Sequence, residues 1–281
     1  DGKPHEKPAL FNTEYGVVET TYTEADESYA AKRRSQKSGV RTRQLPGVSP
    51  LVFSRFLLEK TAFLSLSDMG KALPSYEEIP IACRMEEVVQ TEYKRIEDAL
   101  VRVLRSDRRA AQKILSAYLN LLTVYPDQPY DQKLILYPDS DVPIVEPENI
   151  GDADTFGEKE QKTLEIVKAA IQNGERALIY TSWVRTDSQQ KLKKLLTDEG
   201  YRTEILTDKI KTTNREEWVQ KKLAAGMQVL IVNPSLVETG LDLNAFTTLV
   251  FYSMGYKLFT LRQASRRSWR INQKAPAVKV Y

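Results

Sequence analysis

The chain has 281 residues, of which 41% are hydrophobic and 28% are charged, and its formal net charge at pH 7 is +3. This composition is typical of a soluble globular protein, and the length allows one large domain or two smaller ones. No apolar run approaches the roughly 20 residues that cross a bilayer, which excludes a membrane-spanning protein. A single cysteine, Cys83, and a single histidine, His5, exclude an internal disulfide and a Cys/His zinc site, and they favour a cytoplasmic location.

Residues 1–50 are polar and basic, and we expect this leader to be partly disordered. It holds six cations and no acid from Lys32 to Arg43. Such a run is most often a solvated segment, but it is equally suited to contact a phosphate backbone, and the sequence does not separate the two.

Residues 51–125 are predicted to be mainly helical. Apolar side chains recur at helical intervals within 85–122, at Val88, Val89, Ile96, Leu100, Val103 and Leu104. The following segment, 126–154, contains five prolines and no long periodic stretch, so we expect a linker there.

From residue 155 to residue 281 helix and strand patterns alternate. Helical patterns cover 158–174, 187–200, 212–226 and 257–269, and strand patterns cover 176–183, 201–206, 227–233, 246–253 and 277–281. Continuous apolar strands between helices indicate a parallel sheet covered on both faces, so we predict a doubly wound α/β domain. Ligands of such folds meet the carboxyl ends of the strands, which here lead into 181–185, 233–240 and 253–256.

An arginine cluster stands out near the C-terminus. Arg266, Arg267 and Arg270 lie within five positions, and no carboxylate occurs from Gly255 onwards. If 257–269 is helical, Arg267 and Arg270 share a face with Gln263. Paired guanidinium groups suit phosphate oxygens, whereas the alternative is a solvated basic face that pairs with acids elsewhere in the fold.

The stretch around this cluster, LRQASRRSWRINQ, resembles the sixth motif of superfamily two helicases, and more narrowly that of the Swi/Snf-related branch. Two positions depart from the pattern, since Trp269 stands where the branch usually has His and Asn272 where it has Gly. The matching residues are Gln263, Ala264, Arg267, Arg270, Ile271 and Gln273.

Three further stretches agree with this resemblance. VLIVNPSLVETGLDLNAFTTLVFYS resembles the fifth helicase motif, in which Gly240 would let the backbone approach a ligand closely. RALIYTSW resembles the fourth motif, and Arg215 occupies the place of an arginine that the family carries after it. LPSYEEIPIACRMEEVVQTEY, residues 73–93, looks like the segment that follows the first lobe in Swi/Snf-related proteins.

The resemblance implies a RecA-like second helicase lobe that works with an N-terminal lobe of the same protein. ATP and Mg²⁺ would be bound mainly by that first lobe, and Arg267 and Arg270 would be the catalytic arginine fingers. It also implies cofactor contacts from Gln263, Gly240 and Asp242. The residues implied to contact the DNA backbone, without sequence preference, are Thr181, Ser182, Arg185, Ser235 and Thr239.

The phosphate-cradling loop that ends in Gly-Lys-(Ser/Thr), and the Asp-Glu pair that follows a strand, do not occur in the sequence. We therefore expect this chain to hold half of an ATP site, to be inactive alone and to continue in a longer protein. The alternative is a non-catalytic nucleic-acid or protein-binding module on a helicase-like fold. A small-molecule enzyme is disfavoured, since no nucleophile and base lie at useful spacing.

Overall fold

The computed structural model describes residues 8–23, 39–64, 68, 73–183, 187–237 and 240–281. The chain divides into two compact units, Asp1–Met69 and Gly70–Tyr281. Within the described ranges, none of the helices combines the length and the hydropathy of a membrane span.

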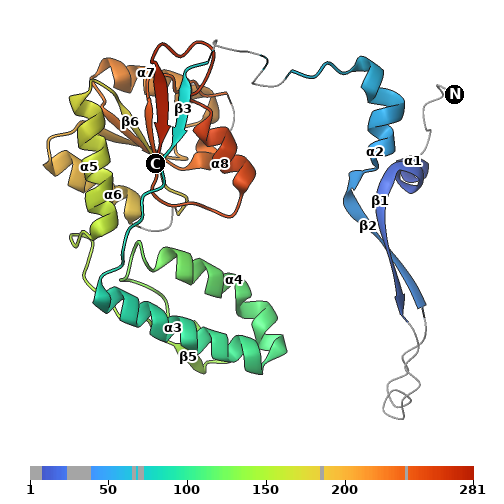
Figure 1. Ribbon diagram of the computed structural model, residues 1–281. Coiled ribbons are helices and arrows are strands. Elements are labelled where there is room, and N and C mark those ends of the chain that lie inside the picture. Colours follow the sequence, from blue (N-terminus) through green and yellow to red (C-terminus); the bar gives the residue numbers. More distant parts are fainter. Residues whose placement is uncertain (1–7, 24–38, 65–67, 69–72, 184–186, 238–239) are drawn as a thin grey trace. The chain divides into compact units, whose positions relative to one another are not determined.

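The first unit contains a helix, a β-hairpin and short helical turns (Figure 1). The hairpin is antiparallel and places Glu19 opposite Arg43, and the ring of Tyr15 packs at 5.5 Å from that of Phe56. Part of the basic stretch therefore lies in a strand, while 32–38 falls outside the described residues. The elements are α1 (Pro8–Tyr15), β1 (Gly16–Thr23), β2 (Gly39–Val48), α2 (Pro50–Val52), η1 (Phe53–Leu57) and η2 (Leu58–Lys60).

The second unit is built around a six-stranded sheet with the order β3-β10-β9-β6-β8-β7, in which every neighbouring pair is parallel. Every residue of β6 and β8 is buried, as expected for central strands covered on both faces. The predicted doubly wound α/β fold is confirmed. The strands are β3 (Ser75–Glu78), β6 (Ala177–Tyr180), β7 (Thr203–Leu206), β8 (Val229–Val232), β9 (Thr248–Phe251) and β10 (Ala277–Val280).

Two layers of helices cover the sheet (Figure 1). Alternate residues of a strand point to opposite faces, so Leu178 and Tyr180 join one core while Ala177 and Ile179 join the other. The first core includes side chains of α7 (Arg215–Ala224) and α8 (Leu258–Ser265), and the second includes side chains of α5 (Glu158–Gln172) and α6 (Ser188–Asp198).

A helical region precedes the sheet domain in the chain. Its helices α3 (Glu87–Ser106) and α4 (Arg108–Val124) share a core, and the carboxylate of Asp107 caps α4 by accepting two backbone N–H groups. The segment 126–154, predicted as a linker, carries the antiparallel strands β4 (Ile135–Leu136) and β5 (Pro143–Val145), which pack on the same core.

The edge strand β3 comes from the region that we expected to be mainly helical. It pairs with β10, with Ala277 opposite Ser75. The indole N–H of Trp269 donates to the carbonyl of Pro74 at 2.8 Å, and its ring lies 5.0 Å from that of Tyr76. Trp269, one of the two residues that depart from the helicase pattern, therefore fastens β3 to the segment after α8.

Candidate functional site

The sequence predicted a helix that continues to residue 269, but the segment after α8 is not helical. The helix ends at Ser265, because the chain then turns back to the loop that precedes β9. The hydroxyl of Ser268, fully buried, donates to the carbonyl of Leu243 at 3.0 Å. The side-chain amide of Gln273 donates to the carbonyl of Asn244 at 2.9 Å. These tertiary hydrogen bonds hold the arginine segment in turns.

Gln263, Arg267 and Arg270 nevertheless come together. They line one open pocket of 470 Å³, together with Phe259, Arg262 and Arg266. We name it the arginine pocket. No carboxylate lines it, and among the described residues none forms an ion pair with Arg262, Arg266 or Arg270. The pocket is therefore strongly cationic.

Burial and the neighbouring charge of Arg270 both lower the pKa of Arg267. A guanidinium remains charged at neutral pH, so the shift reflects first the burial of this charge and second its repulsion by Arg270. An anion placed between them would relieve that repulsion, and phosphate oxygens match the donor geometry of guanidinium groups. The pocket is thus suited to a polyanionic ligand.

Tyr180, on β6, fixes the position of α8 behind this pocket. Its hydroxyl donates to the carbonyl of Ala264 at 2.9 Å, and its side chain is fully buried, which raises its pKa. On the exposed side, the guanidinium carbon of Arg266 lies 6.0 Å from the ring centroid of Trp269. The pocket is therefore held between the sheet and the turn that follows α8.

Gly240 and Asp242, predicted to contact the cofactor, do not line the arginine pocket. Gly240 has a φ of +72°, a left-handed backbone conformation that favours glycine, and a Cβ built there would meet no protein atom within 4 Å. The backbone N–H of Asp242 donates to the carboxylate of Glu216 at 3.0 Å, and the Asp242 carboxylate accepts from the N–H of Asn244 at 3.2 Å. Asp242 shapes its own loop.

A chain of polar contacts crosses three loops at the carboxyl ends of the strands. The N–H of Ser182 donates to the hydroxyl of Ser253 at 2.8 Å, and the Ser182 hydroxyl donates to the Ser253 carbonyl at 3.0 Å. The amide of Asn233 donates to the Ser182 carbonyl at 3.0 Å, while the backbone N–H of Ser235 donates to the Asn233 side chain at 2.9 Å. We name this row the serine edge.

Among the predicted DNA-contacting residues, Ser182 and the exposed Ser235 lie on the serine edge. Thr181 is fully buried, and its hydroxyl accepts from the side-chain amide of Gln189 at 2.7 Å, so it supports α6 and does not face outward. Arg185 and Thr239 lie outside the described residues.

Arg215, singled out by the resemblance, joins two loops of this edge. Its Nε donates to the carbonyl of Ile210 at 3.2 Å, and its Nη1 donates to the carbonyl of Leu236 at 2.8 Å. Sequence reasoning placed Asn233 and Ser253 at the functional edge without assigning them a role. Their position directly after buried strands is the signal that would have identified them.

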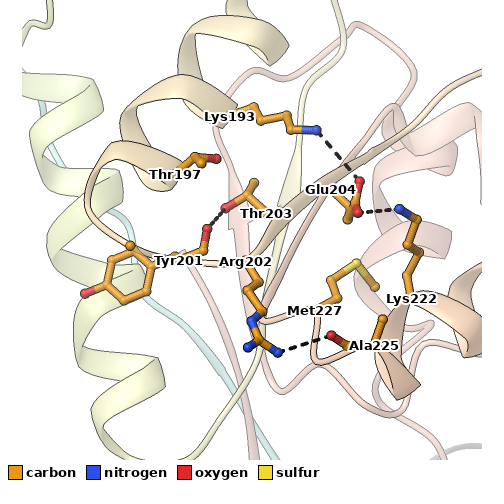
Figure 2. Close-up of a pocket in the computed structure, with 10 residues that line it drawn as sticks. Lys193, Thr197, Tyr201, Arg202, Thr203, Glu204, Lys222, Ala225 and Met227 are labelled. Atoms are coloured by element: carbon orange, nitrogen blue, oxygen red, sulfur yellow. Dashed lines mark hydrogen bonds and ion pairs between the residues drawn. The ribbon is translucent and has the colours of Figure 1, made fainter.

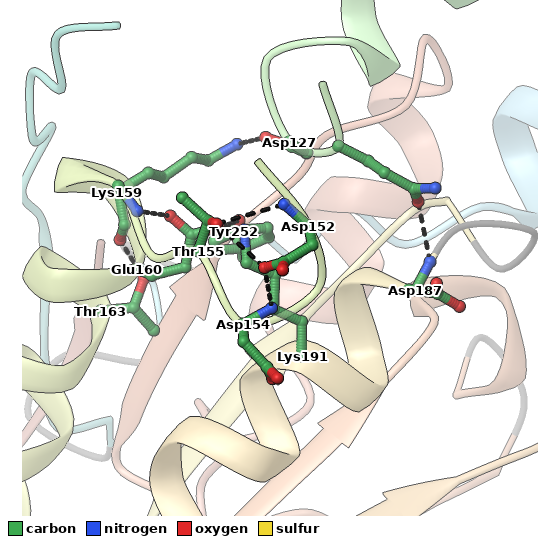
Figure 3. Close-up of polar contacts among 12 residues, drawn as sticks. Asp127, Asp152, Asp154, Thr155, Lys159, Glu160, Thr163, Asp187, Lys191 and Tyr252 are labelled. Atoms are coloured by element: carbon green, nitrogen blue, oxygen red, sulfur yellow. Dashed lines mark hydrogen bonds and ion pairs between the residues drawn. The ribbon is translucent and has the colours of Figure 1, made fainter. Parts of the chain in front are cut away.

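A buried polar cluster joins α5, α6 and Tyr252 (Figure 3). The ammonium of Lys191 on α6 lies 2.8 Å from a carboxylate oxygen of Glu160 on α5, and both side chains are almost fully buried. The same oxygen accepts from the hydroxyl of Tyr252 at 2.8 Å. Lys159 pairs with Asp127, and burial raises the pKa of the Asp127 carboxyl. The ammonium of Lys159 also lies 4.3 Å from the ring centroid of Tyr252.

This cluster ties the helical region to the sheet. Asp127 follows α4, and its neighbour Gln128 accepts from the backbone N–H of Asp187, which precedes α6, at 2.9 Å. Tyr252 directly precedes Ser253 of the serine edge. The cluster therefore anchors residues that border two of the three loops.

A second pocket, of 360 Å³, lies beside β7 (Figure 2). Its cations all have partners within the fold, because Lys193 and Lys222 both pair with Glu204 and the guanidinium of Arg202 donates to the carbonyl of Ala225 at 3.2 Å. The side chains of this pocket are therefore engaged with one another. In the part of the chain that the structure describes, no group of three or more His, Cys, Asp or Glu side chains is placed to hold a metal ion.

The parallel sheet with helices on both faces, and the cationic pocket beside its last helix, define a RecA-like lobe. Residues 158–272 match the helicase conserved C-terminal domain family. No curated protein matches the sequence.

Solved structures share the fold. The C-terminal part of the Fun30 ATPase domain superposes with a TM-score of 0.55 at 13% identity, over 74% of this chain and 84% of that one. The SWI2/SNF2 ATPase core of Sulfolobus solfataricus in complex with dsDNA gives 0.53 at 18% identity, over 74% of this chain and 40% of that one. The C-terminal domain of the same ATPase gives 0.50 at 16% identity, over 73% and 78%. The chain thus spans under half of that ATPase core.

Proposed function

We propose that this chain is the C-terminal lobe of an ATP-dependent DNA translocase of the Swi/Snf-related type. It supplies arginine fingers and DNA-backbone contacts to an ATP site that a first lobe of the same protein completes. The observation that carries this proposal is the arginine pocket, in which Gln263, Arg267 and Arg270 converge without a carboxylate. A cytoplasmic location remains a prediction from composition.

The residues of the arginine pocket fit the phosphates of ATP but not its magnesium ion, because magnesium requires oxygen ligands and the pocket presents guanidinium and amide donors. ATP supplies a γ-phosphoryl group on which negative charge is redistributed during transfer. Arg267 and Arg270 stabilise that charge, and Gln263 offers a neutral hydrogen-bonding group beside them. In other nucleotide hydrolases such fingers accelerate turnover by about 10³ to 10⁵.

The serine edge is the proposed DNA-backbone contact. Hydroxyl and backbone N–H groups bind phosphate oxygens without reading the base sequence, which suits a protein that tracks along DNA. Ser182 and Ser235 contribute such groups, and Arg185 and Thr239 are predicted to extend them. We assign the buried Thr181 a supporting role through Gln189. The similar SWI2/SNF2 ATPase core of Sulfolobus solfataricus was solved in complex with dsDNA, which favours duplex DNA as the ligand here.

The test uses the full-length protein and compares Arg270→Ala with Arg262→Ala. Both arginines line the pocket, but only Arg270 matches the helicase motif. We expect Arg270→Ala to reduce DNA-stimulated ATP hydrolysis by about 10³ or more, with nucleotide and DNA binding largely retained. Arg262→Ala should keep most of the activity.

Unchanged turnover in Arg270→Ala would refute the arginine-finger assignment. If the wild-type full-length protein hydrolysed no ATP with or without DNA, a non-catalytic binding module would replace the translocase. The 281-residue chain alone is expected to be inactive in the same assay, since it lacks a Gly-Lys-(Ser/Thr) loop.

A further inference from the structure

A third pocket, of 460 Å³, lies between the loop that follows β7 and the face of α7. Three lysines, Lys209, Lys211 and Lys221, line it together with the indole of Trp218. We name it the lysine pocket. Ile210, Asn214 and Glu217 complete its lining.

The charge of the lysine pocket is not neutralised. All three lysines are exposed, and none forms an ion pair within the ranges that the structure describes. Glu217 is the single carboxylate in the lining. In the pocket beside β7 in Figure 2, by contrast, both lysines form ion pairs with Glu204. Uncompensated cations at one site attract a polyanion.

Trp218 adds an aromatic surface to these cations. The indole packs partly against the sheet core, as expected for an amphipathic helix, yet part of it lines the pocket. Aromatic side chains beside lysines are typical of sites that follow a nucleic-acid strand, since the cations meet phosphates while a base or sugar packs on the ring. A simple inorganic anion would make no use of the indole.

The position of the pocket connects it to the serine edge. All strands of the sheet are parallel, so the loop after β7 leaves the sheet at the same edge as the loops after β6 and β8. Arg215 fastens this loop to the loop after β8 through the carbonyls of Ile210 and Leu236. Ile210 itself lines the lysine pocket. A strand lying on Ser235 therefore has the lysine pocket next along the edge.

We propose that the lysine pocket is a further nucleic-acid contact, in which Lys209, Lys211 and Lys221 bind the phosphodiester backbone and Trp218 packs against a base or sugar. The inference takes its class of partner from the proposed function. The contact itself needs neither the arginine pocket nor ATP, so the 281-residue chain is sufficient to test it.

The experiment measures fluorescence anisotropy of a labelled mixed-sequence DNA duplex with the 281-residue chain over a range of salt concentrations. The test variant replaces Lys209, Lys211 and Lys221 with Gln. The slope of log affinity against log salt is negative, and each lost phosphate contact should reduce its magnitude by about 0.9, so we expect a total reduction of about 2 to 3. The matched control carries the same change at three exposed lysines elsewhere, Lys60, Lys133 and Lys168.

The control should change the magnitude of the slope by less than the value of about 0.9 expected for one phosphate contact. The inference is overturned if the test and control variants reduce the magnitude of the slope equally, or if the test variant behaves as the wild type. It is also overturned if the wild-type chain does not bind the duplex. Inorganic polyphosphate serves as a competitor. If it binds in the lysine pocket and the duplex does not, the pocket is an anion site and not a nucleic-acid contact.

Trp218→Phe provides a second readout. Phenylalanine keeps a ring that can pack against a base, so affinity should remain close to that of the wild type while the DNA-dependent change in tryptophan emission decreases. An unaltered emission change would remove Trp218 from the contact. The Arg270→Ala assay separates the two proposals. If the triple lysine variant shows the smaller salt dependence of DNA binding while Arg270→Ala keeps its ATP turnover, only the arginine fingers are refuted. If Arg270→Ala loses ATP turnover while the triple lysine variant binds DNA as the wild type does, only the lysine pocket is refuted.

Discussion

At the scale of single residues, the ion pair between Lys191 and Glu160 shows how the loop supports are built. The Glu160 carboxylate is fully satisfied, since it also accepts from the Tyr252 hydroxyl at 2.8 Å and from the N–H of Gly157 at 3.0 Å. A buried pair of this kind contributes little net stability compared with an apolar replacement of both partners. Removing one partner alone is costly, because a charge remains in a site that water does not reach.

Lys191→Met is therefore expected to lower the free energy of unfolding by about 3–5 kcal/mol. The comparison is Lys194→Met on the same helix, whose ammonium pairs with Asp154 at the surface and whose loss should change stability little. Urea unfolding of the 281-residue chain measures both. Equal losses in the two variants would contradict a special role of the buried pair.

At the scale of elements, β3 depends on contacts from the far end of the chain. Among the strands that the structure describes it pairs only with β10, and Trp269 adds a hydrogen bond to Pro74 and a ring contact with Tyr76. The histidine that the helicase pattern has at this position is smaller than tryptophan. The departure from the pattern thus has a structural reason, since the indole covers the joint between β3 and the turn after α8.

Trp269→His should consequently loosen β3 while leaving the central strands intact. The lost ring packing and hydrogen bond predict a decrease of about tenfold or more in the hydrogen-exchange protection of Ser75–Glu78. Protection of Ala177–Tyr180 should stay unchanged. Tyr76→Phe keeps the ring contact and serves as the control. Loss of protection throughout the sheet would show that Trp269 holds the whole domain and not its edge.

The elements also show how far the sequence alone could predict the fold. Strands β6 and β8 were predictable because they are buried on both faces and consist of apolar residues throughout. β3 has the sequence SYEE, which resembles an exposed loop, and it becomes a strand only because β10 offers an open edge. The end of α8 depends on hydrogen bonds from Ser268 and Gln273 to a distant loop, and no local pattern encodes them.

The candidate site was predictable to a similar extent. The motif correctly brought Gln263, Arg267 and Arg270 together, although a pocket and not a helix face unites them. Thr181 was predicted to face a ligand because it follows a strand, yet packing against Gln189 buries it. The lysine pocket combines a loop with a helix face, so its lysines become neighbours only in the folded chain.

At the scale of the whole molecule, the segment that matches the helicase family is shorter than the part of the chain that builds and supports the sheet domain. The match covers 158–272, whereas β3, β10 and Asp127 all lie outside it. β10 closes one side of β9, β3 covers β10, and Asp127 neutralises the half-buried Lys159. The helical region, β3 and β10 therefore belong to the folding unit that presents the serine edge.

This arrangement predicts how shortened forms of the chain behave. A fragment of residues 73–281 retains β3, the helical region and the buried polar cluster, so it should unfold cooperatively at nearly the same temperature as the second unit of the full chain. A fragment of residues 158–281 loses the β3 pairing and leaves Lys159 without Asp127, and its unfolding temperature should be clearly lower. Thermal unfolding followed by circular dichroism measures both. If the shorter fragment were equally stable, the Asp127 ion pair and the β3 pairing would not support the sheet, and the helical region would be an independent attachment.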